Sequence, residues 1–156
     1  MTFYASATGD WLENIVSLLE DNWTSANTDN TTPTIRLITD PSLPKKINFS
    51  HGDYVLIYEE SSDEKPADIG YLGGRQWARI SLDIRTNKGR PRVNKLYGEA
   101  GRIIKANRIH PKDGDGNSLG IDYIIWRGAK DLTNRMYRIW RLVASIEPHK
   151  QYVSVT

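Results

Sequence analysis

The chain has 156 residues, of which 38% are hydrophobic and 26% are charged, a composition typical of one globular domain. This length excludes a complete (β/α)8 barrel, and the absence of cysteine excludes disulfide bonds, thiolate metal sites and cysteine nucleophiles. No apolar run approaches the length of a membrane span, and the N-terminal residues lack the pattern of a secretory signal, so we expect neither a transmembrane segment nor a signal peptide.

The charge of the chain is unevenly distributed along the sequence. Residues 1–74 carry four basic and twelve acidic residues, a net charge of −8, whereas residues 75–156 carry seventeen basic and seven acidic residues, a net charge of +10. Such asymmetry indicates a nucleic-acid surface or complementary faces for assembly. The alternative is that the two halves interleave in one fold and their charges mix on its surface.

The N-terminal half predicts one helix and two strands. Asp10-Trp11-Leu12-Glu13 has the spacing of a capping box, and apolar residues then recur at helical spacing, which predicts an amphipathic helix over 10–23. Alternation predicts a short strand over 34–39, and the apolar run 54–58 predicts a central strand. The acidic stretch that follows contains proline and glycine, so we expect a long loop insertion at 59–76.

Residues 77–85 alternate strictly between apolar and polar side chains and are the clearest strand in the chain. A helical repeat follows over 92–107, in which Gly98 and Gly101 each cost about 1 kcal/mol relative to alanine and therefore indicate a close approach to the sheet. The face of the strand that the alternation assigns to the core consists of Ala78, Ile80, Leu82 and Ile84.

The C-terminal part predicts a turn-rich loop over 112–120 and a strand over 121–126. The final stretch is ambiguous, because alternation fits it less well than helical spacing does. Periodicity alone therefore predicts a helix over 131–146, with an apolar face made of Leu132, Met136, Ile139, Trp140 and Val143.

Catalytic and metal-binding patterns are not found in the sequence. His51, His110 and His149 lie beside turn residues, so we expect exposed loop positions for all three. The segment 113–117 alternates Asp and Asn as a calcium loop does, but Ile124 occupies the position of the bidentate glutamate, so a hairpin turn is the better interpretation. We predict no catalytic residue, no cofactor and no metal site.

Basic residues are the remaining candidates for a functional surface. Some of them flank or line the strand 77–85, and others follow one another at the i+3 spacing of a helix face. Together they predict a stripe that contacts a partner or neutralises phosphates, whereas the alternative is a solvated face. These candidate contact residues are Arg75, Arg79, Arg85, Arg90, Arg92, Arg102, Lys105 and Arg108.

The predicted order is helix, strand, strand, long insertion, strand, helix, strand and a closing element. This order resembles that of the tail-terminator and tail-completion (neck) proteins of long-tailed viruses of bacteria and archaea. The resemblance implies one α+β domain over 1–156, an antiparallel sheet of about four to five strands with two helices packed on it, and a strand as the closing element. The segments that carry it are Asp10–Trp23, Tyr54–Tyr58 with its insertion, Ile80–Arg85, Leu96–Ile104 and Tyr137–Ile146.

The same resemblance implies a structural virion protein at the head–tail junction, assembled in the host cytoplasm. Six copies would form a ring that terminates the tail tube and docks it to the head connector, without a membrane partner and without catalysis. DNA would pass through this ring without sequence readout. The alternative function is a small nucleic-acid-binding module that uses the basic C-terminal half. An enzyme is the weakest hypothesis, because no nucleophile, base and orienting group can be named together.

Overall fold

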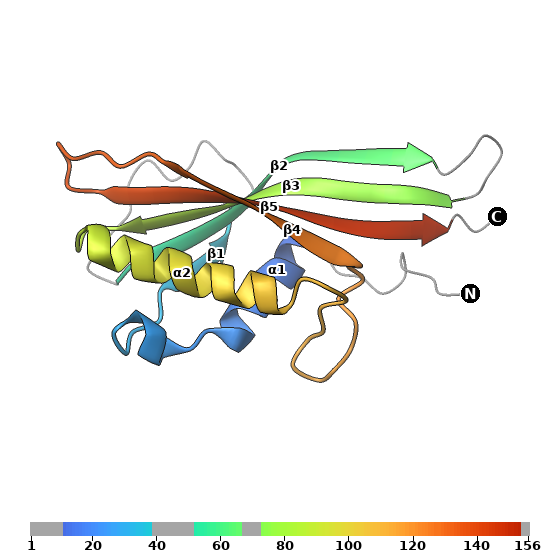
Figure 1. Ribbon diagram of the computed structural model, residues 1–156, viewed down its shortest axis with the longest axis horizontal. Coiled ribbons are helices and arrows are strands. Elements are labelled where there is room, and N and C mark those ends of the chain that lie inside the picture. The colour runs from blue at the N-terminus through green and yellow to red at the C-terminus, as the bar shows by residue number, and fades with distance from the viewer. Residues whose placement is uncertain (1–10, 39–51, 67–72, 154–156) are drawn as a thin grey trace.

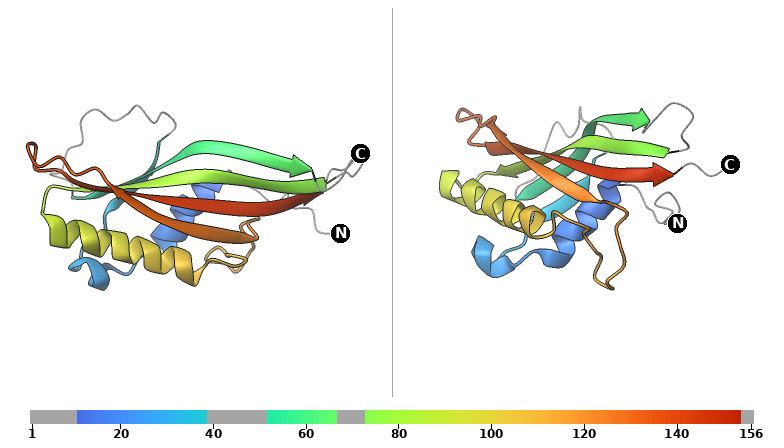
Figure 2. Two further views of the ribbon diagram at one scale, coloured as in Figure 1. Left: turned by 45° about the horizontal axis from the view of Figure 1, so that its top comes forward. Right: turned by 45° about the vertical axis from the view of Figure 1, so that its right-hand side comes forward.

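The structure of the protein is a computed structural model that describes residues 11–38, 52–66 and 73–153. Within these residues a five-stranded sheet has the order β1-β2-β3-β5-β4, and both α-helices lie on the same face of it (Figures 1 and 2). The elements are α1 (Trp11–Asn22), the short 3-10 helix η1 (Ser25–Thr28), β1 (Thr34–Leu37), β2 (Tyr54–Pro66), β3 (Gly73–Thr86), α2 (Arg90–Ala106), β4 (Tyr123–Asp131) and β5 (Trp140–Val153).

The fold class is α+β, as predicted, and the sheet is mostly antiparallel. The pairs β2–β3, β3–β5 and β4–β5 are antiparallel, whereas β1 pairs with β2 in parallel, so the sheet is mixed. Parallel strands need a long crossover connection between them, and residues 38–53 provide it between β1 and β2. Of these residues, 39–51 lie outside the described part of the chain.

The core lies between the helices and one face of the sheet. The apolar side chains of β3 that the alternation assigns to the core are all buried there, at 2% exposure or less. They pack against apolar residues of both helices and of β5 in one continuous cluster. Burial of this apolar face is the main stabilising contribution to the fold. The helix residues in the cluster include Ile15, Leu19, Val93, Leu96 and Ile103.

Gly101 allows α2 to approach the sheet closely, as predicted. A Cβ at this position would lie 3.3 Å from Cζ2 of the Trp126 side chain on β4, whereas a Cβ at Gly98 would meet nothing within 4 Å. The packing reason therefore holds for Gly101 and not for Gly98.

The predicted loop insertion at 59–76 is wrong. β2 continues through this segment to Pro66 and β3 begins at Gly73, and the two pair in an antiparallel hairpin with a register shift between Glu59 and Ser61. Proline and charge misled the prediction, since an edge strand tolerates both where its outer side is unpaired. Only 67–72 remain between the strands, and they lie outside the described residues.

The helix that periodicity predicts over 131–146 is also wrong. Residues from Trp140 onward form β5, the strand that the resemblance implies, and β5 lies between β3 and β4. Its position in the sheet supplies backbone hydrogen bonds on both sides, and these tertiary contacts override the local apolar spacing. Met136, which the helical spacing assigns to an apolar face, is instead 85% exposed in the connection between β4 and β5.

Candidate functional site

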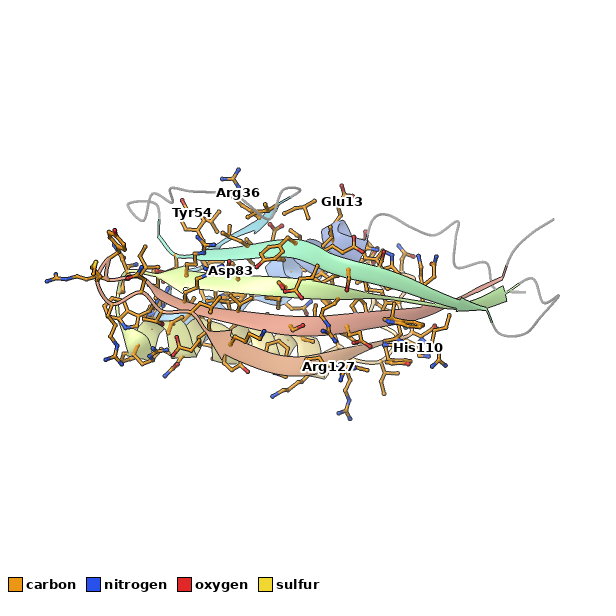
Figure 3. The ribbon with its side chains drawn as sticks, turned by 90° about the horizontal axis from the view of Figure 1, so that it is seen from above. Glu13, Arg36, Tyr54, Asp83, His110 and Arg127 are labelled. Carbon is orange, nitrogen blue, oxygen red and sulfur yellow. The ribbon has the colours of Figure 1, made fainter. Side chains whose placement is uncertain are left out.

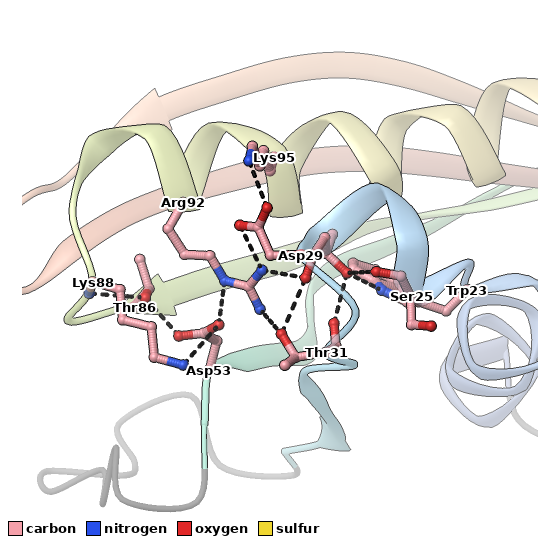
Figure 4. A network of polar contacts seen from close by, with 10 residues as sticks. Trp23, Ser25, Asp29, Thr31, Asp53, Thr86, Lys88, Arg92 and Lys95 are labelled. Atoms are coloured by element: carbon pink, nitrogen blue, oxygen red, sulfur yellow. Dashed lines mark hydrogen bonds and ion pairs between the residues drawn. The ribbon is translucent and has the colours of Figure 1, made fainter.

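The acidic and basic halves of the sequence meet inside the fold. Arg92 Nε lies 2.7 Å from Asp53 Oδ2, and Lys95 Nζ lies 2.7 Å from Asp29 Oδ1 (Figure 4). Acidic residues of the first half of the sequence therefore form ion pairs with basic residues of the second half within one chain. This agrees with the alternative interpretation of the charge asymmetry, in which the two halves interleave in one fold.

Arg92 does not belong to a contact surface, so this candidate is wrong. Its side chain is 7% exposed and is enclosed by Asp53, by the Thr28 carbonyl oxygen and by Thr31 Oγ1, to which Arg92 Nη2 donates at 2.5 Å (Figure 4). Asp53 is held in turn by Thr86 Oγ1, which donates to it at 2.5 Å. Arg92 thus joins α2 to the residue before β2, to the end of η1 and to the segment that follows η1, and it is a structural residue.

Arg75, Arg79 and Arg85 alternate along β3 with the side chains that face the core, so they lie on the sheet face opposite the helices, which we call the open face. Asp83 has the same orientation and is labelled in Figure 3. No helix covers this face within the part of the chain that the structure describes. Arg85 Nε and Nη2 donate to Asp83 at 3.1 and 2.8 Å, and Arg141 makes the same two-pronged contact at 2.9 and 2.7 Å. Burial raises the pKa of Asp83, but hydrogen bonds from both arginines outweigh it and hold that pKa below its ordinary value of 3.8.

A second acidic centre on the open face is Glu147. It accepts from Arg127 Nη2 at 3.0 Å, lies 3.9 Å from Arg79 Nη2, and is 2.6 Å from His149 Nε2. Burial raises the pKa of Glu147, but the contacts with His149 and Arg127 together lower it by more, so its pKa lies below the ordinary 4.5. The arginines of the open face are thus largely occupied by the protein's own carboxylates.

His149 is not an exposed loop residue, which corrects the prediction for this histidine. It lies in β5, is 8% exposed, and stacks between Tyr123 and Trp77 with ring centroids 4.6 and 5.7 Å apart. Its Nδ1 has no hydrogen-bond partner among the described residues. Ser145, the serine of β5, is four residues from His149 along the strand, a separation of about 13 Å, which is too far for a nucleophile and its base. His110 is exposed as predicted, and His51 lies outside the described residues.

The other candidates lie on or beside α2, away from the open face. Arg90 pairs with Asp131 at 2.9 Å, Arg102 Nε donates to Glu99 Oε1 at 2.7 Å, and Lys105 Nζ lies 5.8 Å from the Trp126 ring centroid. Arg108 follows α2 and is exposed. The eight predicted residues are therefore divided between two sides of the sheet and do not form a single stripe.

The structure instead brings together a different set of basic side chains, which we call the basic end. A hollow of about 680 Å³ lies between the turn before α2 and the β4–β5 connection. Arg90 is the only predicted contact residue in this set. Sequence reasoning missed the others because they come from two segments about 45 residues apart. The basic residues that line this hollow are Lys88, Arg90, Arg135 and Arg138, beside Trp140.

The β4–β5 connection carries exposed apolar side chains at the tip of the basic end. Met136 is 85% exposed, Tyr137 is 70% exposed and Leu132 is 49% exposed. This hairpin projects beyond the rest of the sheet (Figure 1). Exposed apolar groups concentrated on a projecting tip are typical of an interaction surface.

A third surface lies on β2, and we call it the acidic edge. β1 ends opposite Ile57, and among the described strands none pairs with the outer side of β2 beyond that residue. A hollow of about 370 Å³ opens here, lined by Leu12, Ile38 and Tyr58 and bordered by Glu59 and Glu60. Both glutamates are exposed.

The segment 113–117 forms a turn, as predicted. Asp113 Oδ1 accepts from the backbone N–H groups of Asp115 and Asn117 at 2.9 and 2.8 Å, so this carboxylate closes the loop. Over 11–38, 52–66 and 73–153 no group of three acidic or histidine side chains is arranged to hold a metal ion. Neither α1 nor α2 is long and apolar enough to cross a membrane, and the described chain contains no other helix that is.

No protein-family model matches the chain, and no curated protein matches it by sequence.

Proposed function

We propose that this chain is a structural virion protein at the head–tail junction, which forms a ring that terminates the tail tube and docks it to the head connector. The observation that carries this proposal is the projecting β4–β5 hairpin, whose tip exposes Met136 and Tyr137 at 85% and 70%. A tip of this kind is suited to binding another protein, because aromatic and methionine side chains are enriched at protein interfaces.

Two further observations support assembly as the function. The α+β architecture, with a strand as its closing element, agrees with what the resemblance implies for the fold. The basic end and the acidic edge are separate surfaces of opposite charge on one subunit. A ring built head to tail requires two different, complementary surfaces on each copy. DNA inside such a ring would meet backbone electrostatics and no base-reading site.

The test combines self-association with binding to tail tubes. Light scattering after size-exclusion chromatography is expected to detect a closed oligomer, and electron microscopy is expected to find a ring at the ends of purified tail tubes. The variant Met136→Ser/Tyr137→Ser should lose both properties and keep its thermal stability, since both side chains are exposed. A chain that stays monomeric at high concentration and leaves tail tubes bare would refute the proposal.

A nucleic-acid-binding module is the second candidate, favoured by the basic end alone. Four basic side chains and Trp140 line one hollow, a combination that also suits phosphates and stacked bases. If all four cations contact phosphates, the logarithm of the binding constant should fall with the logarithm of salt concentration at a slope of about −3 to −4. Binding weaker than millimolar at physiological salt would eliminate this candidate.

A further inference from the structure

We propose that the basic end of one subunit docks on the acidic edge of a second copy, with Met136 and Tyr137 entering the hollow beside Tyr58. This inference rests on the proposed self-assembly and names the two surfaces that perform it. The partner of the projecting hairpin is a second copy of this chain.

The receiving surface has both the shape and the chemistry that such a tip requires. The hollow of about 370 Å³ has apolar side chains from α1, from the residue after β1 and from β2, namely Leu12, Ile38 and Tyr58. Its size lies within the range of pockets that bury a ligand. Glu59 and Glu60 border the apolar part, and the register shift between Glu59 and Ser61 turns the strand at this point.

The inserting surface has the complementary pattern. Met136 and Tyr137 are flanked in the sequence by Arg135 and Arg138, all four are exposed, and both arginines also line the hollow of the basic end. Apolar side chains bordered by cations thus face apolar side chains bordered by carboxylates. Opposite charges around an apolar centre fix the register of a contact and reject wrong partners.

One subunit cannot satisfy both surfaces by itself. The hairpin projects from one end of the sheet, whereas α1, which supplies Leu12 to the hollow, lies under a different part of it (Figures 1 and 2). An exposed apolar tip that fits a hollow elsewhere on the same chain makes a head-to-tail contact between copies. Such a contact repeats and closes into a ring when the rotation between copies permits it.

The apolar tip favours a protein partner over nucleic acid. Phosphate recognition needs cations along a track, whereas the eight predicted contact residues are divided between two sides of the sheet, and four of them pair with carboxylates of the same chain, namely Arg79, Arg85, Arg90 and Arg102. Met136 and Tyr137 gain most from leaving water, which an apolar hollow provides.

Charge reversal tests the docking directly. Arg135→Glu and Glu59→Arg should each weaken self-association by about tenfold or more, because each sets like charges against each other across the contact. The combined variant should restore association, since the ion pair is re-formed with its sense reversed. Lys130→Glu, an exposed β4 residue outside both surfaces, is the matched control and should associate like the unmodified protein.

Disulfide trapping provides the second measurement, and the absence of native cysteine makes it unambiguous. A mixture of Met136→Cys and Ser61→Cys proteins should form a cross-linked dimer under mild oxidation, whereas Met136→Cys mixed with Ser17→Cys, an exposed residue of α1, should not. Thermal unfolding of every variant identifies any that fail to fold.

The outcomes separate this inference from the function on which it rests. Rings that persist in both single charge variants, without the cross-link, would overturn the docking and leave the ring function intact. An unmodified chain that never associates would refute both. Loss of DNA binding in Arg135→Glu, with self-association unchanged, would assign the basic end to nucleic acid and also overturn the inference.

Discussion

Arg92→Met is the substitution that best separates a structural arginine from a contact arginine. It removes the cation from a nearly buried network and leaves Asp53, which is 1% exposed, without its 2.7 Å partner. Breaking a buried pair from one side costs about 3–5 kcal/mol. Asp53 would keep the Thr86 hydroxyl and the half-exposed Lys88, whose Nζ lies 4.0 Å away, so we expect the lower part of this range. For a chain of this size, that loss corresponds to a fall of about 6–20 °C in Tm.

Urea unfolding followed by circular dichroism measures this cost, and Lys95→Met is the matched control. Lys95 is half-exposed and pairs with the exposed Asp29, so water screens the pair and its removal should cost much less than the removal of Arg92. The double variant Arg92→Met/Asp53→Asn should cost less than the sum of its single changes, because neither charge is then left buried alone. Arg92→Met that unfolds like the unmodified protein but loses affinity for DNA or for other copies would refute the structural role.

Two further predictions concern α2 and the open face. Gly98→Ala should stabilise the protein by about 0.5–1 kcal/mol, because space is open at this position. Gly101→Ala should stabilise it less or destabilise it, because the new Cβ would lie 3.3 Å from Trp126. Thermal unfolding compares the two variants, and equal stabilisation by both would contradict the close approach of α2 to the sheet. The pKa of Asp83 is depressed in the folded state, so the stabilisation that Asp83 contributes is complete above about pH 4 and is lost as the pH falls further. Asp83→Asn should therefore lower the unfolding free energy at neutral pH and make the fall of that free energy in acid less steep. If the unfolding free energy of Asp83→Asn falls as steeply in acid as that of the unmodified protein, other carboxylates cause the acid sensitivity.

The period of apolar residues in the sequence predicts β3 and α2 correctly. The alternation over 77–85 predicts which side chains of β3 are buried, and the helical repeat over 92–107 matches α2 closely. These predictions succeed because one face of each element meets the same apolar core along its length, so the period in the sequence repeats the period of burial.

The failed predictions lie where distant pairing outweighs local preference. Residues 59–66 carry charge and proline, yet they form an edge of the sheet because β3 supplies their backbone partners. Residues 140–146 have helical spacing, yet β3 and β4 enclose them as a strand. In each case the hydrogen bonds come from strands that lie elsewhere along the chain, and no local window contains that information.

The sequence alone determined the ingredients of the candidate surfaces, an acidic half and a basic half. Only the tertiary structure decided which charges are buried and which lie together on a surface. It buried Arg92 against Asp53, and it gathered Lys88 and Arg90 with Arg135 and Arg138 around one hollow. The physical reason is that a charge acts through its distance and its exposure to water, and both are set by contacts between residues far apart along the chain.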